Sequence, residues 1–168
     1  MLKHMKGTIR KRLGVLVAAA ALGSTACAVD GPAVAANTAS QLQALASSLR
    51  NQAQAGNGIA TAYLAQYPNH YAQLIVRTRS GEVEIHQQFD EMMIILDGDA
   101  EIITGGTPQN PHSVRPGELR SPSVSGGTSV AMATGNLLHL IAGTPHQVIL
   151  SPGGFIAYID VKVVHVNQ

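Results

Sequence analysis

The chain has 168 residues, 45% of them hydrophobic, and a mean hydropathy of +0.12, which suits one domain with a packed core and excludes a disordered protein. Five of the eleven Lys and Arg residues precede Leu13, whereas all ten acidic residues follow Ala28, so the net charge of +1 becomes −4 once the first 28 residues are set aside. A mildly acidic body without basic clusters excludes a nucleic-acid-binding protein, because phosphate contacts need grouped Lys and Arg.

Residues 1–28 have the three-part layout of a secretory signal peptide. A basic stretch is followed by an apolar run, Leu13 to Leu22, and by small residues that end in Ala26-Cys27-Ala28. That run is shorter than the roughly 20 residues of a membrane-spanning helix, and no later segment is long enough either, so we expect no transmembrane span in the mature chain. A buried N-terminal helix is the structural alternative, which the six basic-type residues before the apolar run make improbable.

Cleavage after Ala28 predicts an exported protein, periplasmic or secreted. In the alternative, a lipoprotein signal, Cys27 becomes the acylated first residue and anchors the protein to the membrane. Ser24 weakens that alternative, because it stands where such signals usually carry an aliphatic residue. Cys27 is the only cysteine, so no intramolecular disulfide can form and stability must come from packing.

Residues 29–69 are predicted to form a linker and one amphipathic helix. Small and turn-prone residues fill the stretch to Thr38. From Ala39 to Ala55 three leucines follow at helical spacing, with Ser40 or Thr38 as the N-cap and Gly56 as the stop. We interpret the leucine stripe as a docking face against the main domain.

Residues 70–168 are predicted to form one all-β domain. Short β-rich runs alternate with Gly, Pro and Asp, a pattern typical of a sandwich or barrel. The predicted strands are Tyr71 to Thr78, Glu82 to Gln87, Met92 to Leu96, Ala100 to Ile103, Ser129 to Ala133, Leu137 to Ile141, Gln147 to Leu150 and Phe155 to Val166. The proline-rich stretch from Thr104 to Thr128 is expected to be a surface excursion with one short hairpin.

The stretch from Glu84 to Gly98 carries a histidine, an acid and a glycine at a characteristic spacing. It resembles the first motif of the cupin superfamily, in which two histidines separated by one residue precede a glutamate and then a glycine. His86 takes the place of the second histidine, Glu91 that of the acid and Gly98 that of the glycine. Glu84 stands where the first histidine would be.

The stretch from Gly135 to His146 resembles the second cupin motif, from its opening glycine through the Gly143-Thr144-Pro145 turn to the ligand histidine. Ile141 replaces the usual proline, and Leu150 stands where asparagine often follows. The likeness extends more loosely to the chain end, where it is similar to uncharacterised small bacterial single-domain cupins. It implies a cupin (jelly-roll) double-stranded β-barrel that begins after the predicted helix.

The resemblance implies a metal site, and strand geometry is compatible with one. Side chains alternate along a strand, so Glu84 and His86 point to one face, while Glu91 and His146 arrive from other strands. The ligand set is either two histidines and two carboxylates, or His86, Glu91 and His146 with Glu84 as a catalytic general base. The ion would be Fe, Mn, Zn or Ni.

Each candidate also has a structural interpretation. His86 could be a half-buried strand histidine, His146 a turn residue, and Glu84 and Glu91 exposed acids. His139, on the same predicted face as Leu137 and Ile141, is interpreted as a packed residue that supports the site. The remaining histidines after residue 69, His70, His112 and His165, are expected to be solvated.

No Gly-x-Ser-x-Gly elbow, phosphate loop or second cysteine appears, which excludes the commonest hydrolase, nucleotide-binding and zinc-ribbon patterns. We therefore predict a metal-dependent cupin enzyme that acts on a small organic molecule as an oxygenase, isomerase or lyase. A noncatalytic module that binds a small ligand or a metal is the alternative, and a metal-free structural barrel is a third. A homodimer through edge strands is also possible, since such edges need covering.

Overall fold

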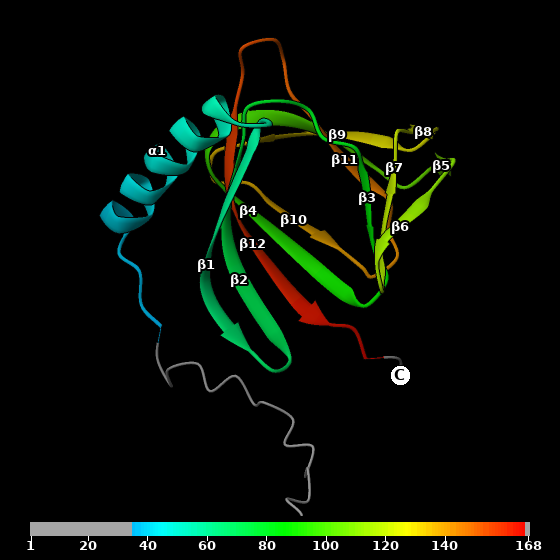
Figure 1. Cartoon of the computed structure of the whole chain (residues 1–168), viewed down its shortest axis with the longest axis horizontal. Coiled ribbons are helices and arrows are strands. Elements are labelled where there is room, and N and C mark those ends of the chain that lie inside the picture. Colours follow the sequence, from blue (N-terminus) through cyan, green and yellow to red (C-terminus); the bar gives the residue numbers. More distant parts are fainter. Residues whose placement is uncertain (1–34, 167–168) are drawn as a thin grey trace, which may run out of the picture.

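The computed structural model describes residues 35–166, which form one α-helix and a strongly curled β-sheet (Figure 1). The predicted signal peptide, Cys27 and most of the predicted linker lie outside the described residues. Export, periplasmic or secreted localisation and the lipid anchor therefore stay predictions. No helix in the described part of the chain is long and apolar enough to span a membrane.

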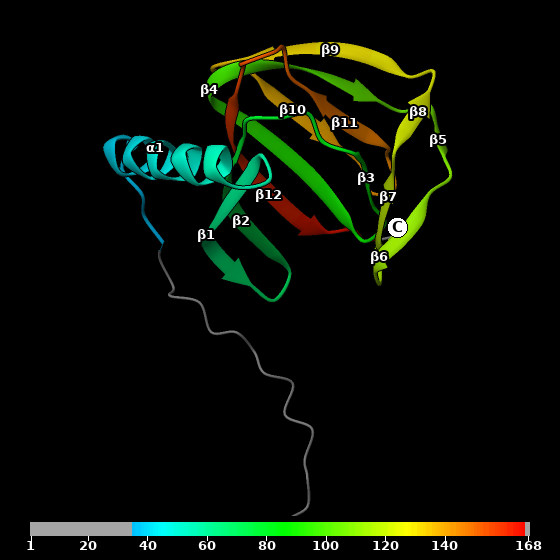
Figure 2. The same cartoon turned by 45° about the horizontal axis from the view of Figure 1, so that its top comes forward.

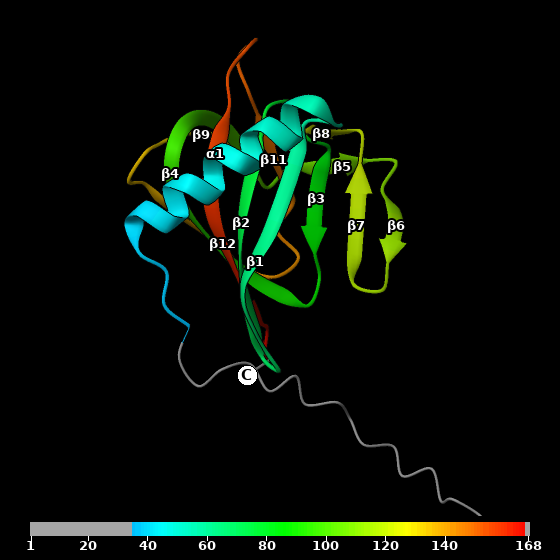
Figure 3. The same cartoon turned by 60° about the vertical axis from the view of Figure 1, so that its left-hand side comes forward.

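Helix α1 (Ala39–Ala55) has the predicted bounds. Thr38 caps it, because its side-chain oxygen accepts from the Gln41 amide at 3.3 Å while the Gln41 side chain accepts from the Thr38 amide at 2.8 Å. Leu49 is buried in a cluster with Leu74 and Val76. The leucine stripe is thus a docking face, and the helix lies along the outer face of the sheet (Figures 1 and 3).

All eight predicted strands are present with ends within two residues of those predicted, except that two of them form one continuous strand, β4. The strands are β1 (Ile59–Tyr67), β2 (His70–Arg77), β3 (Val83–His86), β4 (Phe89–Thr104), β5 (Thr107–Gln109), β6 (His112–Arg115), β7 (Glu118–Ser121), β8 (Ser123–Ser125), β9 (Thr128–Ala133), β10 (Leu137–Leu140), β11 (His146–Ile149) and β12 (Ile156–Val164). The described residues are mostly β with one helix, which is consistent with the predicted cupin jelly roll.

Strand β4 joins the two halves of the curled sheet. Its first part pairs with β12 and β10, and its second part pairs with β9 and β11. Gly98 lies where the partners change, with a φ of 75°. A Cβ at this position would overlap with the carbonyl oxygen of Phe155, so the bend requires glycine. The glycine is therefore a bend inside a strand and not a turn between two strands.

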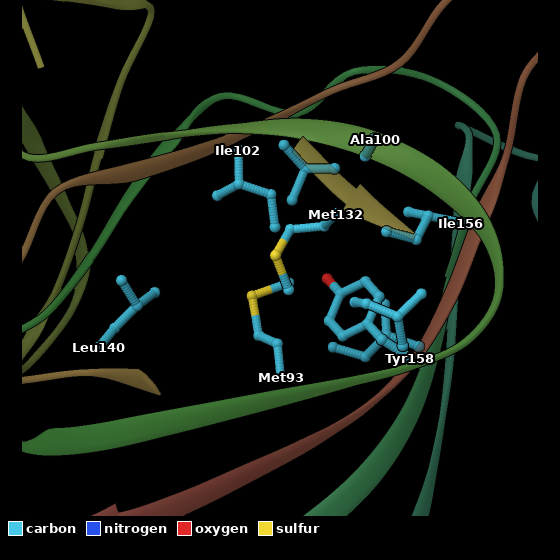
Figure 4. Close-up of a cluster of buried hydrophobic side chains, with 10 residues drawn as sticks. Met93, Ala100, Ile102, Met132, Leu140, Ile156 and Tyr158 are labelled. Carbon is cyan, nitrogen blue, oxygen red and sulfur yellow. The ribbon is translucent and has the colours of Figure 1, made fainter. Parts of the chain in front are cut away.

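Both halves of the sheet contribute to one hydrophobic core. Met93 from the first part of β4 and Ile102 from the second are buried in the same cluster as Met132 of β9 and Tyr158 of β12 (Figure 4). The two halves face each other in Figure 2, and the buried cluster draws on strands of both halves. The core fills one part of the barrel interior and leaves the rest to polar side chains.

Two features differ from the sequence analysis. Strand β1 was not predicted, and it pairs antiparallel with β2 inside the segment assigned to the linker and helix; the division of the chain at residues 28 and 69 itself stays a prediction. The excursion from Thr104 to Thr128 contains four short strands, with β6 paired to β7 and β5 paired to β8. Strand β7 also pairs with β3, which brings the excursion against the predicted site.

Replacing Leu49 with alanine should lower the free energy of unfolding by about 2–5 kcal/mol, because a fully buried leucine is lost from the interface between helix and sheet. Chemical denaturation measures this change. Gln54→Ala, on the exposed side of the same helix, is the control and should change stability by less than about 0.5 kcal/mol. Equal stability of both variants would show that the helix does not dock as described.

Candidate metal centre

The four predicted site residues come from three strands that line the barrel interior. Glu84 and His86 lie two residues apart on β3, Glu91 is near the start of β4, and His146 opens β11 and pairs with Glu84. His86, Glu91 and His146 are each at most 4% exposed. Strand alternation therefore places all four side chains on the inner face, as the sequence predicted.

One carboxylate oxygen lies between the two imidazoles. Glu91 Oε2 is 3.3 Å from His86 Nε2 and 3.3 Å from His146 Nε2, and the two rings are 5.2 Å apart between centroids. Glu84 is close to the same point, with its Oε2 3.6 Å from His86 Nε2. Ligand atoms of Glu84, His86 and His146 all lie within 4.8 Å of one another. The structure thus brings the four residues together.

The hydrogen bonds of the two histidines orient them for coordination. His86 Nδ1 is 2.6 Å from Glu118 Oε2, and His146 Nδ1 is 3.2 Å from the carbonyl oxygen of Thr144. An acceptor at each Nδ1 holds a proton there and turns each Nε2 towards Glu91. The same arrangement, with the distal nitrogen bonded to a carboxylate or a carbonyl, accompanies metal-ligating histidines.

Two atoms at this point lack hydrogen-bond partners. Among the described residues, the buried side-chain atoms without a partner are His86 Nε2, Glu91 Oε2 and Asp160 Oδ1. An unpartnered buried polar atom is costly, so each such atom calls for an explanation. A cation between His86 and Glu91 would satisfy the first two.

The spacing of the donor atoms also fits one ion. Two ligand atoms about 2.1 Å from a tetrahedral metal lie about 3.4 Å from each other. The two separations of 3.3 Å at Glu91 Oε2 match that value. The residues present therefore fit a divalent ion without rearrangement of the strands.

Burial and neighbouring carboxylates set the charges of the two histidines. Burial lowers the pKa of His146 to about 4, so this imidazole is neutral. For His86, burial acts in the same direction, but the nearby carboxylates of Glu118 and Glu84 outweigh it and raise the pKa to about 9. His86 without a metal therefore holds a second proton, which a bound ion would displace.

Two arginines hold the Glu84 carboxylate. Arg77 of β2 pairs with Oε1, and Arg120 Nη2 of β7 lies 3.4 Å from Oε2. Burial acts to raise the pKa of Glu84, but the neighbouring His86 and the charges of both arginines hold it well below its ordinary value. Glu84 is thus a firmly ionised carboxylate that is already shared with two cations.

A lysine stands on the other side of the centre. Lys162 Nζ lies 3.2 Å from Glu91 Oε2 and 3.7 Å from Asp160 Oδ2. Asp160 is fully buried and accepts a hydrogen bond of 2.6 Å from Gln73. Burial raises the pKa of Asp160 to about 7. The predicted ligand Glu91 therefore already has one cationic neighbour.

The charged residues around the four candidates were not predicted from the sequence. Asp160 and Lys162 did carry a signal, because they alternate with Ile159, Val161 and Val163 in the last strand, which puts them on the inner face. Glu118 carried none, since its role follows from the pairing of β7 with β3. His139 was placed wrongly, because it is exposed on the outer face of the sheet and supports nothing in the site.

Three of the four candidates, Glu84, His86 and Glu91, border a small cavity of about 160 Å³, and His146 does not. Its wall contains the charged groups together with Ile59, Thr61, Tyr63 and Tyr71 of β1 and β2. Two larger hollows, of about 510 and 590 Å³, lie beside α1 and β9, and neither is bordered by the two histidines. The small cavity is therefore where chemistry at the candidate centre would take place.

Solved structures similar to this chain include cupin proteins. One is a cupin superfamily protein from Desulfitobacterium hafniense, at 15% identity over 66% of this chain and 81% of that one, with a TM-score of 0.46. Another is a cupin-2 domain from Rhodospirillum rubrum, at 11% identity over 66% and 63%, with a TM-score of 0.47. A polyketide cyclase from Streptomyces resistomycificus matches at 11% identity over 64% and 66%, also with a TM-score of 0.47.

No protein-family model matches the chain. No curated protein sequence matches it either. At 11–15% identity, the three solved structures carry no argument about chemistry in this chain.

Replacing Glu118 with glutamine should weaken the binding of a divalent ion about 10- to 100-fold, because the carboxylate that orients His86 is lost while both imidazoles remain. Titration with Zn²⁺ against a chromophoric competitor measures the affinity. Glu82→Gln removes an exposed acid just before β3 and should leave the affinity unchanged. Equal affinities of the two variants would exclude an orienting role for Glu118.

Proposed function

We propose that this chain is a cupin-type barrel that holds one divalent metal ion at His86, Glu91 and His146 and acts on a small organic molecule in the adjoining cavity. The observation that carries the proposal is a pair of buried atoms without a hydrogen bond, His86 Nε2 and Glu91 Oε2, which lie 3.3 Å apart beside the ammonium group of Lys162. His146 Nε2 lies at the same distance from that oxygen. A cation satisfies all three atoms at once.

Two imidazoles and one carboxylate form the ligand set of non-haem iron enzymes, and the same set accepts Mn, Zn or Ni. When bound, such an ion supplies a Lewis acid or an activator of oxygen. The chain's own residues would hold the ion, exclude bulk water and position the substrate. An oxygenase, an isomerase and a lyase are all compatible with this arrangement.

The ion pairs of Glu84 bear on its role. A carboxylate paired with Arg77 and Arg120 is a weak proton acceptor, which disfavours it as a general base. Its Oε2 lies within reach of the centre. We therefore favour Glu84 as a fourth ligand, shared between the ion and the two arginines, over Glu84 as the base.

Lys162 favours a second candidate function, a noncatalytic module that binds a small ligand without a metal. Its ammonium group lies 3.2 Å from Glu91 Oε2 and already offsets part of that carboxylate's charge. A metal ion bound to Glu91 would have this cation as a close neighbour, which opposes binding. Elemental analysis distinguishes the two functions, because only the first retains a metal.

The purified chain should contain about one divalent ion per molecule, and His86→Ala and His146→Ala should each abolish that stoichiometry, because each variant loses one of the two imidazole ligands. Elemental analysis after gel filtration without chelator measures the content. His112→Ala, at an exposed histidine of β6, is the matched control and should keep its metal. Metal retained in both of the first two variants would eliminate the proposed centre.

Glu84→Gln should weaken metal affinity by roughly tenfold or more if Glu84 is a ligand, because a neutral amide replaces an anionic donor. The same titration with Zn²⁺ measures this effect. Unchanged affinity together with lost turnover of a substrate would instead support the base role. Thermal unfolding of the metal-free variant shows whether Arg77, which keeps its hydrogen bond to Tyr158 but loses its carboxylate partner, destabilises the fold.

A further inference from the structure

The carboxylates that line the small cavity are matched in number by its arginine and lysine side chains. Four cationic and four anionic side chains border it: Arg77, Arg115, Arg120 and Lys162 against Glu84, Glu91, Glu118 and Asp160. A divalent ion adds two positive charges to this matched set. Uncompensated charge is expensive in a partly buried site, so a ligand that enters it should bring negative charge.

One of these cations is not committed to a close partner. Arg77 and Arg120 hold Glu84, and Lys162 lies between Glu91 and Asp160. The side chain of Arg115, by contrast, is 66% exposed, and its one ion pair with a described residue is a long contact of 3.9 Å to Glu118 Oε2. Its planar set of donors is therefore free for a ligand.

Arg115 is also fixed in place relative to the centre. It ends β6, and β6 pairs with β7, which carries Glu118 and in turn pairs with β3. Glu118 contacts both Arg115 Nη2 and His86 Nδ1 through the same oxygen. The carboxylate of Glu118 thus links the Arg115 guanidinium to the predicted metal ligand His86, and all three residues border the same cavity.

The size and the other wall of the cavity restrict the ligand further. Its volume of about 160 Å³ corresponds to about five water molecules at about 30 Å³ each. Tyr63 and Tyr71 lie on this wall with their rings edge to face, 5.7 Å apart. The space suits a molecule of few atoms with a short hydrocarbon part.

We propose that the cavity takes a small organic carboxylate, whose anionic group binds Arg115 while the rest of the molecule extends towards His86 and Glu91, which border the same cavity. A guanidinium and a carboxylate form two parallel hydrogen bonds, which gives both affinity and orientation. This inference rests on the proposed function, because the surplus positive charge comes from the metal ion. Arg115 is then the residue that selects acids over neutral analogues.

The test uses the full chain loaded with Zn²⁺ and titration calorimetry with propionate, lactate and malonate, each compared with neutral propionamide. At least one of the acids should bind saturably and propionamide should not. Arg115→Gln should weaken that acid's binding about tenfold or more, since a charge-assisted pair is lost. Arg79→Gln, at an exposed arginine that does not border the cavity, should bind like the unaltered chain.

The inference is overturned if none of the three acids binds, if propionamide binds as tightly as propionate, or if Arg115→Gln matches Arg79→Gln. The last result would mean that carboxylates simply coordinate the zinc. Each of these outcomes leaves the metal centre standing, because the zinc content of every variant is measured first. A chain that takes up no zinc refutes the proposed function, and the inference falls with it.

Discussion

The organisation of the site follows from the burial of one carboxylate oxygen, Glu91 Oε2, among groups that must compensate for its charge. Two imidazole nitrogens at 3.3 Å and an ammonium at 3.2 Å surround it. A buried anion is tolerated only when it is paired, so the strands that supply these partners have to meet at this point. The register of β3, β4, β11 and β12 brings these partners together. The ion pairs of Glu84 and Glu118 then hold the site residues in position.

The sequence was a good guide to the inner face of the barrel and a poor guide to what surrounds it. His86, Glu91 and His146 could be predicted because their spacing belongs to a recognisable motif and strand alternation is a local rule. Glu118 and Arg120 could not, because their contacts depend on which strands pair across a proline-rich excursion. Long-range pairing of this kind leaves no periodic trace in a single sequence.

The same distinction applies to the fold. The helix was predicted with its exact bounds because a capping residue, a leucine stripe and a terminal glycine all agree. Strand β1 was missed because its alternating small residues, as in Ala60-Thr61-Ala62, carry a weak hydrophobic pattern. Gly98 suggested a break between two strands, but pairing on both sides keeps β4 continuous through a bend. The prediction for His139 was wrong for a related reason, because the pairing of β10 with β4 determines which of its side chains point outwards.

The hairpin of β6 and β7 combines two tasks in one small element. It supplies Glu118, which fixes the orientation of His86, and it forms one wall of the cavity with Arg115. Any displacement of the hairpin that widened the cavity would also weaken the contact that orients the His86 imidazole. A change in this hairpin that alters ligand preference through Arg115 would therefore also alter the metal centre through Glu118. Gains in selectivity at this hairpin would come with weaker binding of the metal ion.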